Sequence, residues 1–220
     1  TTLIMFPIIL IFYPRMVEWN KSANPGYRLQ LVTKLLIWLS IPFGCLMILV
    51  GPFFVEYFFH NGSYTLSHTQ ISQISLITLT PGIFFISIFS LTTRWILAQK
   101  SSRRLIQFCL MLTGAALISL PIFNLLTAQY QEVGLLWSQL GLQIIGYGGV
   151  SLLFLSKANG FSMRIFISDF FLTFAIFMPS LISYYFLQKL LSFALLLIAL
   201  IIFLCIFWKE DFSALIKNLD

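Results

Sequence analysis

The apolar segment at residues 76–104 constrains the fold more than any other part of the sequence. It reads LITLTPGIFFISIFSLTTRWILAQKSSRR, with Pro81 in its first third and one arginine, Arg94, before a basic cluster at its end. A helix of about 20 apolar residues crosses the ~30 Å hydrocarbon core of a bilayer. Basic residues accumulate on the cytoplasmic side of such spans. The segment therefore predicts a transmembrane helix whose C-terminal end faces the cytoplasm.

The composition excludes a soluble domain. Hydrophobic residues make up 59% of the 220 residues and charged residues only 9%, whereas about 25% of a typical soluble domain is charged. Long uncharged runs favour helices over a β-barrel. The net charge of +6 does not indicate nucleic-acid binding, because Lys and Arg lie in short loops between apolar segments, where they orient helices. The predicted fold class is all-α, a polytopic transmembrane helix bundle.

The apolar segments predict seven spans. The first span is short for a complete crossing, so we expect a fragment that lacks its N-terminal part. Prolines lie inside several spans, where broken or kinked helices are typical of transporters; they are Pro42, Pro52, Pro81, Pro121 and Pro179. The predicted spans cover residues 1–13, 29–59, 76–104, 105–127, 135–156, 165–187 and 190–208.

The distribution of Lys and Arg predicts the orientation of these spans. Counted from the N-terminus with the basic residues that flank them (Lys34 for the first; Lys100, Arg103 and Arg104 for the third), the successive loops hold four, none, three, none, two and one of these residues, and the C-terminal tail holds two. Basic loops stay in the cytoplasm. The odd-numbered loops and the C-terminus are therefore predicted to be cytoplasmic.

Charge within a membrane span is costly and often functional, and Arg94, Glu56 and Asp169 lie within predicted spans outside their basic ends. Arg94 either lines a cavity for an anionic substrate or extends to the cytoplasmic headgroups. Glu56 lies near the outer end of its span, where an interfacial position is favoured. Asp169 lies early in its span, near Arg164 and the positive helix N-terminus, where a structural role is favoured. Glu56 and Asp169 are retained as weak candidates for ion coupling.

A stripe of polar and small residues follows one face of the fifth span. Gln139, Gln143, Gly146 and Tyr147 are spaced at i, i+4, i+7 and i+8. Such a stripe either borders a hydrophilic cavity or packs against another helix, since small and amide residues are common at helix contacts in membranes. Asn124 is a similar, weaker candidate. We take Gln139, Gln143 and Asn124, with Arg94, as the candidate substrate-contacting residues.

The sequence does not predict an enzyme. His60 and His68 share one outer loop near Glu56, and a solvated loop is favoured there over an acid–base or metal site. The sequence contains no nucleophile–base pair, phosphate-binding glycine loop or metal-ligand spacing, so no metal or cofactor is predicted.

Four stretches resemble the C-terminal half of the MOP exporter superfamily, and most closely its lipid II flippase (MurJ/MviN) family. They are TTLIMFPIILIFYPRM, IPFGCLMILVGPFFVEYFFHNGSYT, RWILAQKSSRR and EVGLLWSQLG. The two helices that follow the last stretch match a member with fourteen helices. The chain departs from the family at Gln99–Ser102, which reads QKSS where the family usually has an acidic residue and Thr-Pro.

The resemblance implies a flippase for a polyisoprenoid-pyrophosphate-linked cell-wall precursor, lipid II, in the bacterial cytoplasmic membrane. Residues 1–158 would form most of its second lobe and residues 159–208 two additional helices that hold the lipid tail. Residues 209–220 would form a cytoplasmic tail. The implied partners are the lipid-linked oligosaccharide, membrane lipids and the N-terminal lobe of the same protein. An ion gradient or the membrane potential would drive alternating access, without a cofactor.

Three other functions remain open from the sequence. The first is an O-antigen or capsular-polysaccharide flippase, or another exporter of the same superfamily, including drug antiporters. The second is a membrane-embedded glycosyl- or acyltransferase, which would need Glu56, His60 and His68 to act together. The third is a structural membrane scaffold without a central cavity.

Overall fold

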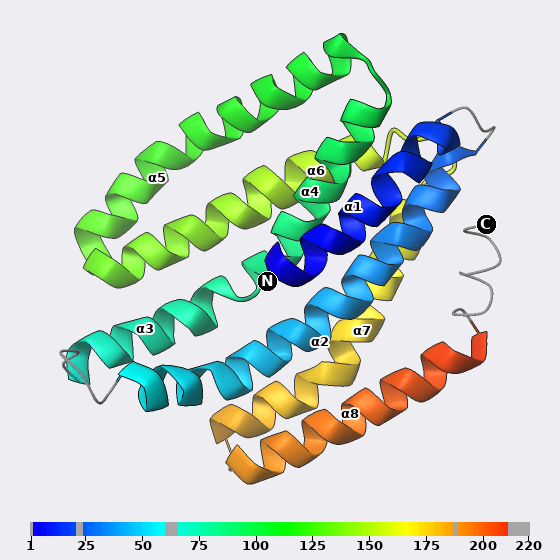
Figure 1. Cartoon of the computed structure of the whole chain (residues 1–220). Coiled ribbons are helices and arrows are strands. Elements are labelled where there is room, and N and C mark those ends of the chain that lie inside the picture. Colours follow the sequence, from blue (N-terminus) through cyan, green and yellow to red (C-terminus); the bar gives the residue numbers. More distant parts are fainter. Residues whose placement is uncertain (1, 21–23, 60–65, 187–188, 211–220) are drawn as a thin grey trace. The chain divides into compact units, whose positions relative to one another are not determined.

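The described part of the chain is helical throughout. The computed structural model describes residues 2–20, 24–59, 66–186 and 189–210, and contains no strand among them (Figure 1). The predicted all-α class is therefore confirmed. The elements are α1 (Thr2–Trp19), α2 (Pro25–Phe59), α3 (Leu66–Leu79), α4 (Gly82–Ala98), α5 (Ser102–Leu142), the π-helix η1 (Gln143–Gly149), α6 (Val150–Leu155), α7 (Met163–Phe186) and α8 (Lys189–Glu210).

The helices are compatible with a membrane-embedded bundle. Within the described residues, three helical stretches are long and apolar enough to cross a bilayer: Pro25–Phe58, Ser102–Leu155 and Met163–Ser183. The pair α3 and α4 qualifies as a fourth if it counts as one broken span, whereas Ala194–Cys205 is a shorter apolar helix. These lengths support a multi-span membrane protein without fixing the predicted number of seven spans.

The predicted fourth and fifth spans form a helical hairpin. Helical hydrogen bonding runs from Ser102 to Leu142, but Gln131 has φ 51° and ψ −125°, and Figure 1 shows the chain reversing within α5. The first arm of the hairpin covers residues 102–130 and the second arm residues 132–155. Three contacts between the arms follow an antiparallel register, since residue numbers fall on one arm as they rise on the other. They are Phe108 with Phe154, with ring centroids 5.1 Å apart, Ala115 with Gly146, and Leu126 with Gly134. The predicted seven-residue loop AQYQEVG is therefore mostly helical, with the reversal concentrated at Gln131.

The predicted third span is wrong in its bounds. Helix α3 already begins at Leu66, and α4 ends at Ala98, so the basic residues Arg103 and Arg104 belong to α5. The chain turns at Lys100, which has φ 51°. Ser101 then caps α5 by accepting a hydrogen bond from the Arg104 N–H at 3.4 Å, which satisfies one of the free donors at the helix start.

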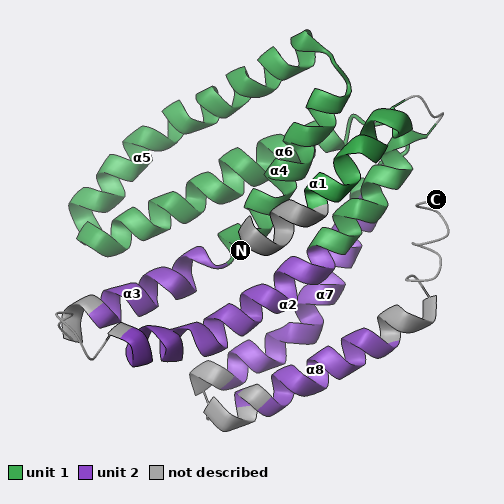
Figure 2. Ribbon diagram, in the orientation of Figure 1, with its two compact units in different colours: residues 1–36, 81–163 green, residues 37–80, 164–220 purple. Residues whose placement is uncertain are grey.

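The chain divides into two compact units (Figure 2). Unit 1 contains residues 1–36 and 81–163, and unit 2 contains residues 37–80 and 164–220. The second division, after Met163, lies close to the predicted start of the additional helices at residue 159. Residues 37–80 group with the helices after Met163 in unit 2. Residues 211–220 of the predicted tail lie outside the described residues.

Unit 1 is organised around an aromatic core between α4 and the α5 hairpin. Ile96, Phe108, Val150 and Phe154 are buried together. The ring of Phe89 stacks on Phe108 with centroids 5.8 Å apart. Offset aromatic pairs of this kind add about 0.5–1.5 kcal/mol to the burial of their surfaces. This core fixes α4 against both arms of the hairpin.

Unit 2 contains a second core, shared by α2, α7 and α8. The Phe203 ring of α8 meets Trp38 of α2 at 6.3 Å and Phe177 of α7 at 5.5 Å between centroids, both edge to face. The Ser183 hydroxyl also lies 2.9 Å from the Ser192 hydroxyl, both buried. Hydroxyl pairs of this type join helices where apolar surroundings leave few other partners.

Candidate functional site

The most unusual polar group in unit 1 is the side chain of Gln143. Only 6% of this residue is exposed, and its Oε1 is buried without a hydrogen-bond partner among the described residues. The oxygen lies against Gly82, the first residue of α4: a Cβ at position 82 would be 1.4 Å from it. A buried amide oxygen without a donor is costly, by about 1–3 kcal/mol. The site therefore has an unmet capacity to accept a hydrogen bond or to coordinate a cation.

The adjoining start of α4 has no side-chain cap. Thr80 and Pro81 separate α4 from α3, and Pro81 provides no side-chain cap. The first N–H groups of a helix have no acceptor within the helix and carry partial positive charge. The Gln143 oxygen thus lies beside the electropositive start of a helix, in an otherwise apolar segment. This pairing of an unpartnered acceptor with a helix start is the centre of the candidate site.

Tyr147, from the predicted stripe, and its neighbour Gly148 pack against α4. The Tyr147 ring lies 4.8 Å from the Phe89 ring, and a Cβ at Gly148 would be 2.3 Å from the Phe85 ring. Gly146 faces Ala115 on the other arm of the hairpin. These residues belong to η1, and π-helical turns are frequent at functional sites. The stripe thus combines helix packing, at its small and aromatic members, with one unsatisfied polar group, at Gln143.

Arg94 is half-buried near the C-terminal end of α4. Its guanidinium carbon lies 5.8 Å from the centre of the Tyr13 ring of α1. A cation over an aromatic face gains about 0.5–2 kcal/mol. This contact orients the guanidinium against α1. Both predicted roles, cavity cation and interfacial anchor, are compatible with this position.

Two of the predicted site residues are more accessible. Asn124 is exposed on the first arm of α5 and Gln139 is half-buried on the second. The Gln139 carbonyl accepts a hydrogen bond from the backbone N–H of Gln143, one turn further along the helix, whereas Asn124 lies on the other arm. They are therefore placed within the same unit as Gln143 and Arg94 but not in its buried centre.

The two acidic candidates belong to unit 2. Glu56 is exposed at the end of α2, among large exposed aromatic residues; they are Phe53, Phe54, Tyr57 and Phe58. Asp169 is half-buried in the second turn of α7, beyond the first-turn N–H groups. Its backbone oxygen accepts a hydrogen bond from the Thr173 hydroxyl at 2.7 Å.

The histidine pair is only partly described. His60 lies outside the described residues, and of His68 only the backbone, in α3, is described. Within the described part of the chain, no group of three or more His, Cys, Asp or Glu side chains could hold a metal ion.

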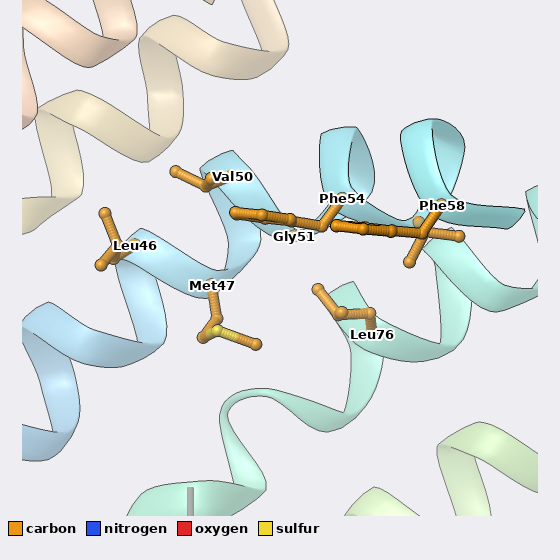
Figure 3. A pocket seen from close by; sticks show the side chains of 8 residues that line it. Leu46, Met47, Val50, Gly51, Phe54, Phe58 and Leu76 are labelled. Carbon is orange, nitrogen blue, oxygen red and sulfur yellow. The ribbon is translucent and has the colours of Figure 1, made fainter.

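An apolar pocket in unit 2 was not predicted from the sequence. It has a volume of about 640 Å³ and lies between α2 and Leu76 of α3 (Figure 3). The stacked rings of Phe54 and Phe58, with centroids 6.0 Å apart, form one side. Gly51 allows α3 to approach, because a Cβ there would be 2.5 Å from a methyl group of Leu76. The pocket has the size and apolar lining for part of a hydrocarbon chain.

No family model, no curated protein and no solved structure matches this chain.

Proposed function

We propose that the protein is a membrane transporter that moves a polyisoprenoid-pyrophosphate-linked cell-wall precursor, lipid II, across the bacterial cytoplasmic membrane for peptidoglycan synthesis. The observation that carries the proposal is the broken apolar segment at Pro81, where the start of α4 meets the buried, unpartnered oxygen of Gln143. Discontinuous helices with polar groups at the break are a recurring feature of transporter binding sites. A purely structural scaffold would not need an unsatisfied acceptor such as the Gln143 oxygen in its core.

Two further features support a lipid-linked anionic substrate. Arg94 supplies a half-buried cation on the same helix as the break, and guanidinium groups bind phosphate oxygens in a fork geometry. The apolar pocket beside Phe54 and Phe58 has the volume and lining to hold part of a hydrocarbon chain. The lipid II flippase family, which the sequence resembles, moves a substrate that has both an anionic group and a hydrocarbon chain. That substrate is a pyrophosphate on a polyisoprenoid chain.

In this proposal the residues of the chain have separate roles. Arg94 attracts the pyrophosphate, and Gln143, Gln139 and Asn124 offer amide groups to the polar part of the substrate. Glu56 and Asp169 are the candidates for coupling to an ion gradient. The C-terminus faces the cytoplasm, and an N-terminal lobe of the same protein completes the pathway.

A complementation experiment tests the proposal. Cells are depleted of their own lipid II flippase and supplied with the full-length gene that encodes this chain, as wild type, as Arg94→Ala or as Arg103→Ala. Arg103→Ala removes the same charge from an exposed position of α5 and is the matched control. We expect growth to be restored by the wild type and the control and to be lost with Arg94→Ala at equal expression.

Each other outcome has a definite meaning. A well-expressed wild type that fails to restore growth contradicts the lipid II assignment and favours a polysaccharide-unit flippase. Rescue by Arg94→Ala shows that Arg94 is an interfacial anchor and removes it from the substrate site.

A further inference from the structure

A polar cavity in unit 1 lies apart from the candidate transport site. It has a volume of about 450 Å³ and is lined by the end of α1, the starts of α2 and α5, the end of α4 and the turn after α6. This volume is within the usual range of small-ligand sites, roughly 300–1,000 Å³. Helix ends surround the cavity, so in a membrane-spanning bundle it would lie at the level of the lipid headgroups.

The lining of the cavity is positively charged. Arg104 and Lys157 both line it, and none of its lining residues is acidic. Arg104 donates a hydrogen bond from Nη1 to Oε1 of Gln99 at 2.5 Å. This bond occupies the acceptor of Gln99 and leaves its amide N–H groups, as well as the other guanidinium N–H groups, as donors. The cavity thus has an excess of donors over acceptors.

Two additional donors strengthen this excess. The Nδ2 of Asn20, another lining residue, is buried without a hydrogen-bond partner among the described residues. A buried donor without an acceptor is unfavourable, so a ligand that accepts from it gains affinity. Ser101 brings the first turn of α5 to the cavity wall, and the first N–H groups of a helix bind anions.

We propose that this cavity binds a phosphate group, carried either by a phospholipid headgroup or by free phosphate. An arginine fork, a lysine point charge and a helix N-terminus are the three elements that recognise phosphate oxygens elsewhere. The basic loop that contains Lys157 and the one that precedes α5 are both predicted to be cytoplasmic. Basic pockets between helices on that side of a membrane bind phosphate headgroups. The proposal does not depend on the transported substrate.

Native mass spectrometry of the protein in detergent tests the proposal, with dioleoylphosphatidylglycerol as the probe and dioleoylglycerol as its phosphate-free analogue. The cavity variant is Arg104→Gln with Lys157→Gln. The matched control is Lys100→Gln with Arg103→Gln, which removes the same charge from exposed neighbours that do not line the cavity. We expect the cavity variant to bind phosphatidylglycerol about tenfold more weakly or worse, and the control to stay within about twofold of wild type.

A single substitution gives an independent test. Asn20→Asp keeps the shape of the side chain but replaces the unpartnered donor with a carboxylate. We expect it to weaken binding of phosphatidylglycerol by about tenfold or more, because the carboxylate repels the phosphate. Unchanged binding in this variant would overturn the proposal, provided that thermal unfolding shows a folded protein.

The remaining comparisons identify the source of the phosphate. Displacement of phosphatidylglycerol by excess inorganic phosphate supports free phosphate as an occupant, and resistance to displacement supports the lipid. Equal losses in the cavity variant and its control, or equal binding of dioleoylglycerol, would show that surface charge or acyl chains account for binding and would overturn the proposal.

Discussion

The side-chain oxygen of Gln143 occupies the space that a side chain at residue 82 would need. A Cβ at Gly82 would lie 1.4 Å from that oxygen and 2.5 Å from the carbon that bears it. The glycine is therefore required for the contact between η1 and the start of α4. It allows an amide to approach the helix start that follows the break at Pro81.

Gly82→Ala should destabilise the protein through this contact. The methyl group forces Gln143 out of its position, and overpacking of this kind costs about 1–3 kcal/mol. Gln143→Ala in the same chain should relieve the clash, so the double variant should be more stable than the sum of the single effects predicts. Thermal unfolding in detergent of all four proteins measures the coupling.

Gly114→Ala is the matched control for this substitution. A Cβ there meets no atom within 4 Å, and the residue lies inside α5. Alanine in a helix interior is about 0.5–1 kcal/mol more stable than glycine, so this variant should be unchanged or more stable. Equal losses at Gly82 and Gly114 would contradict the packing that we describe.

A second close approach holds the start of α2 against the turn after α6. Gln30, which is 7% exposed, donates from Nε2 to the Ser162 carbonyl at 3.1 Å and accepts from the Ser162 N–H at 3.0 Å. The Gly26 N–H donates to the Asn159 carbonyl at 2.8 Å. One amide side chain thus substitutes for a backbone partner and binds both polar groups of Ser162.

Gln30→Met should remove both of these hydrogen bonds while keeping the volume of the side chain. The Ser162 N–H and carbonyl lose partners at a part-buried position, which should lower the free energy of unfolding by about 1–3 kcal/mol. Gln107→Met, at an exposed position of α5, is the control and should be neutral. Equal unfolding free energies for the two variants would show that the Gln30 pair contributes nothing.

The hairpin in α5 can be tested by crosslinking. A Cβ at Gly146 would lie 4.0 Å from the Cβ of Ala115, and disulfides join Cβ atoms about 3.5–4.5 Å apart. In a background with the three native cysteines replaced by alanine, Ala115→Cys with Gly146→Cys should oxidise to an intramolecular disulfide. Mass spectrometry after alkylation should find both thiols protected.

The pair Ala115→Cys with Gly141→Cys is the control for crosslinking. A Cβ at Gly141 meets no atom within 4 Å, so its thiol should remain open to alkylation. A straight α5 without the reversal at Gln131 would leave the thiols of both pairs reactive.

The sequence predicted the helical class and the reversal of the chain between the fourth and fifth spans, because both depend on local signals. Long uncharged runs require helices in a membrane, and the polar stretch around Gln131 interrupts two such runs. The prolines were less informative. Pro81 lies where two helices separate, but Pro42, Pro52, Pro121 and Pro179 lie inside helices. Neighbouring groups can satisfy the carbonyl that a proline frees, so sequence alone does not distinguish a break from an accommodated proline.

The candidate site could be predicted only in part, because some of its contacts join residues far apart in the sequence. The helical spacing placed Gln143 on a stripe with Gly146 and Tyr147, and the structure brings Gln143 and Tyr147 to α4 and Gly146 to the other arm of the hairpin. The π-helical turn that contains them was not predicted, because its sequence, QIIGYGG, has no periodicity that separates it from an α-helix. The contact with Gly82 joins segments far apart in the chain, and only the folded core around Phe89 and Phe108 brings them together.

The orientation of the chain can be measured by thiol labelling in intact cells. Ala128 and Ser156 are both exposed; Ala128 lies at the end of the first hairpin arm, beside the reversal, and Ser156 directly follows the second arm. The distribution of Lys and Arg predicts that residue 128 is external and residue 156 cytoplasmic. In the background without native cysteines, Ala128→Cys should react with a membrane-impermeant maleimide in intact cells, and Ser156→Cys only after permeabilisation. Because both positions are exposed, burial would not explain a difference between them. Labelling of Ser156→Cys alone in intact cells would reverse the predicted orientation and place the cavity lined by Arg104 and Lys157 on the outer side of the membrane.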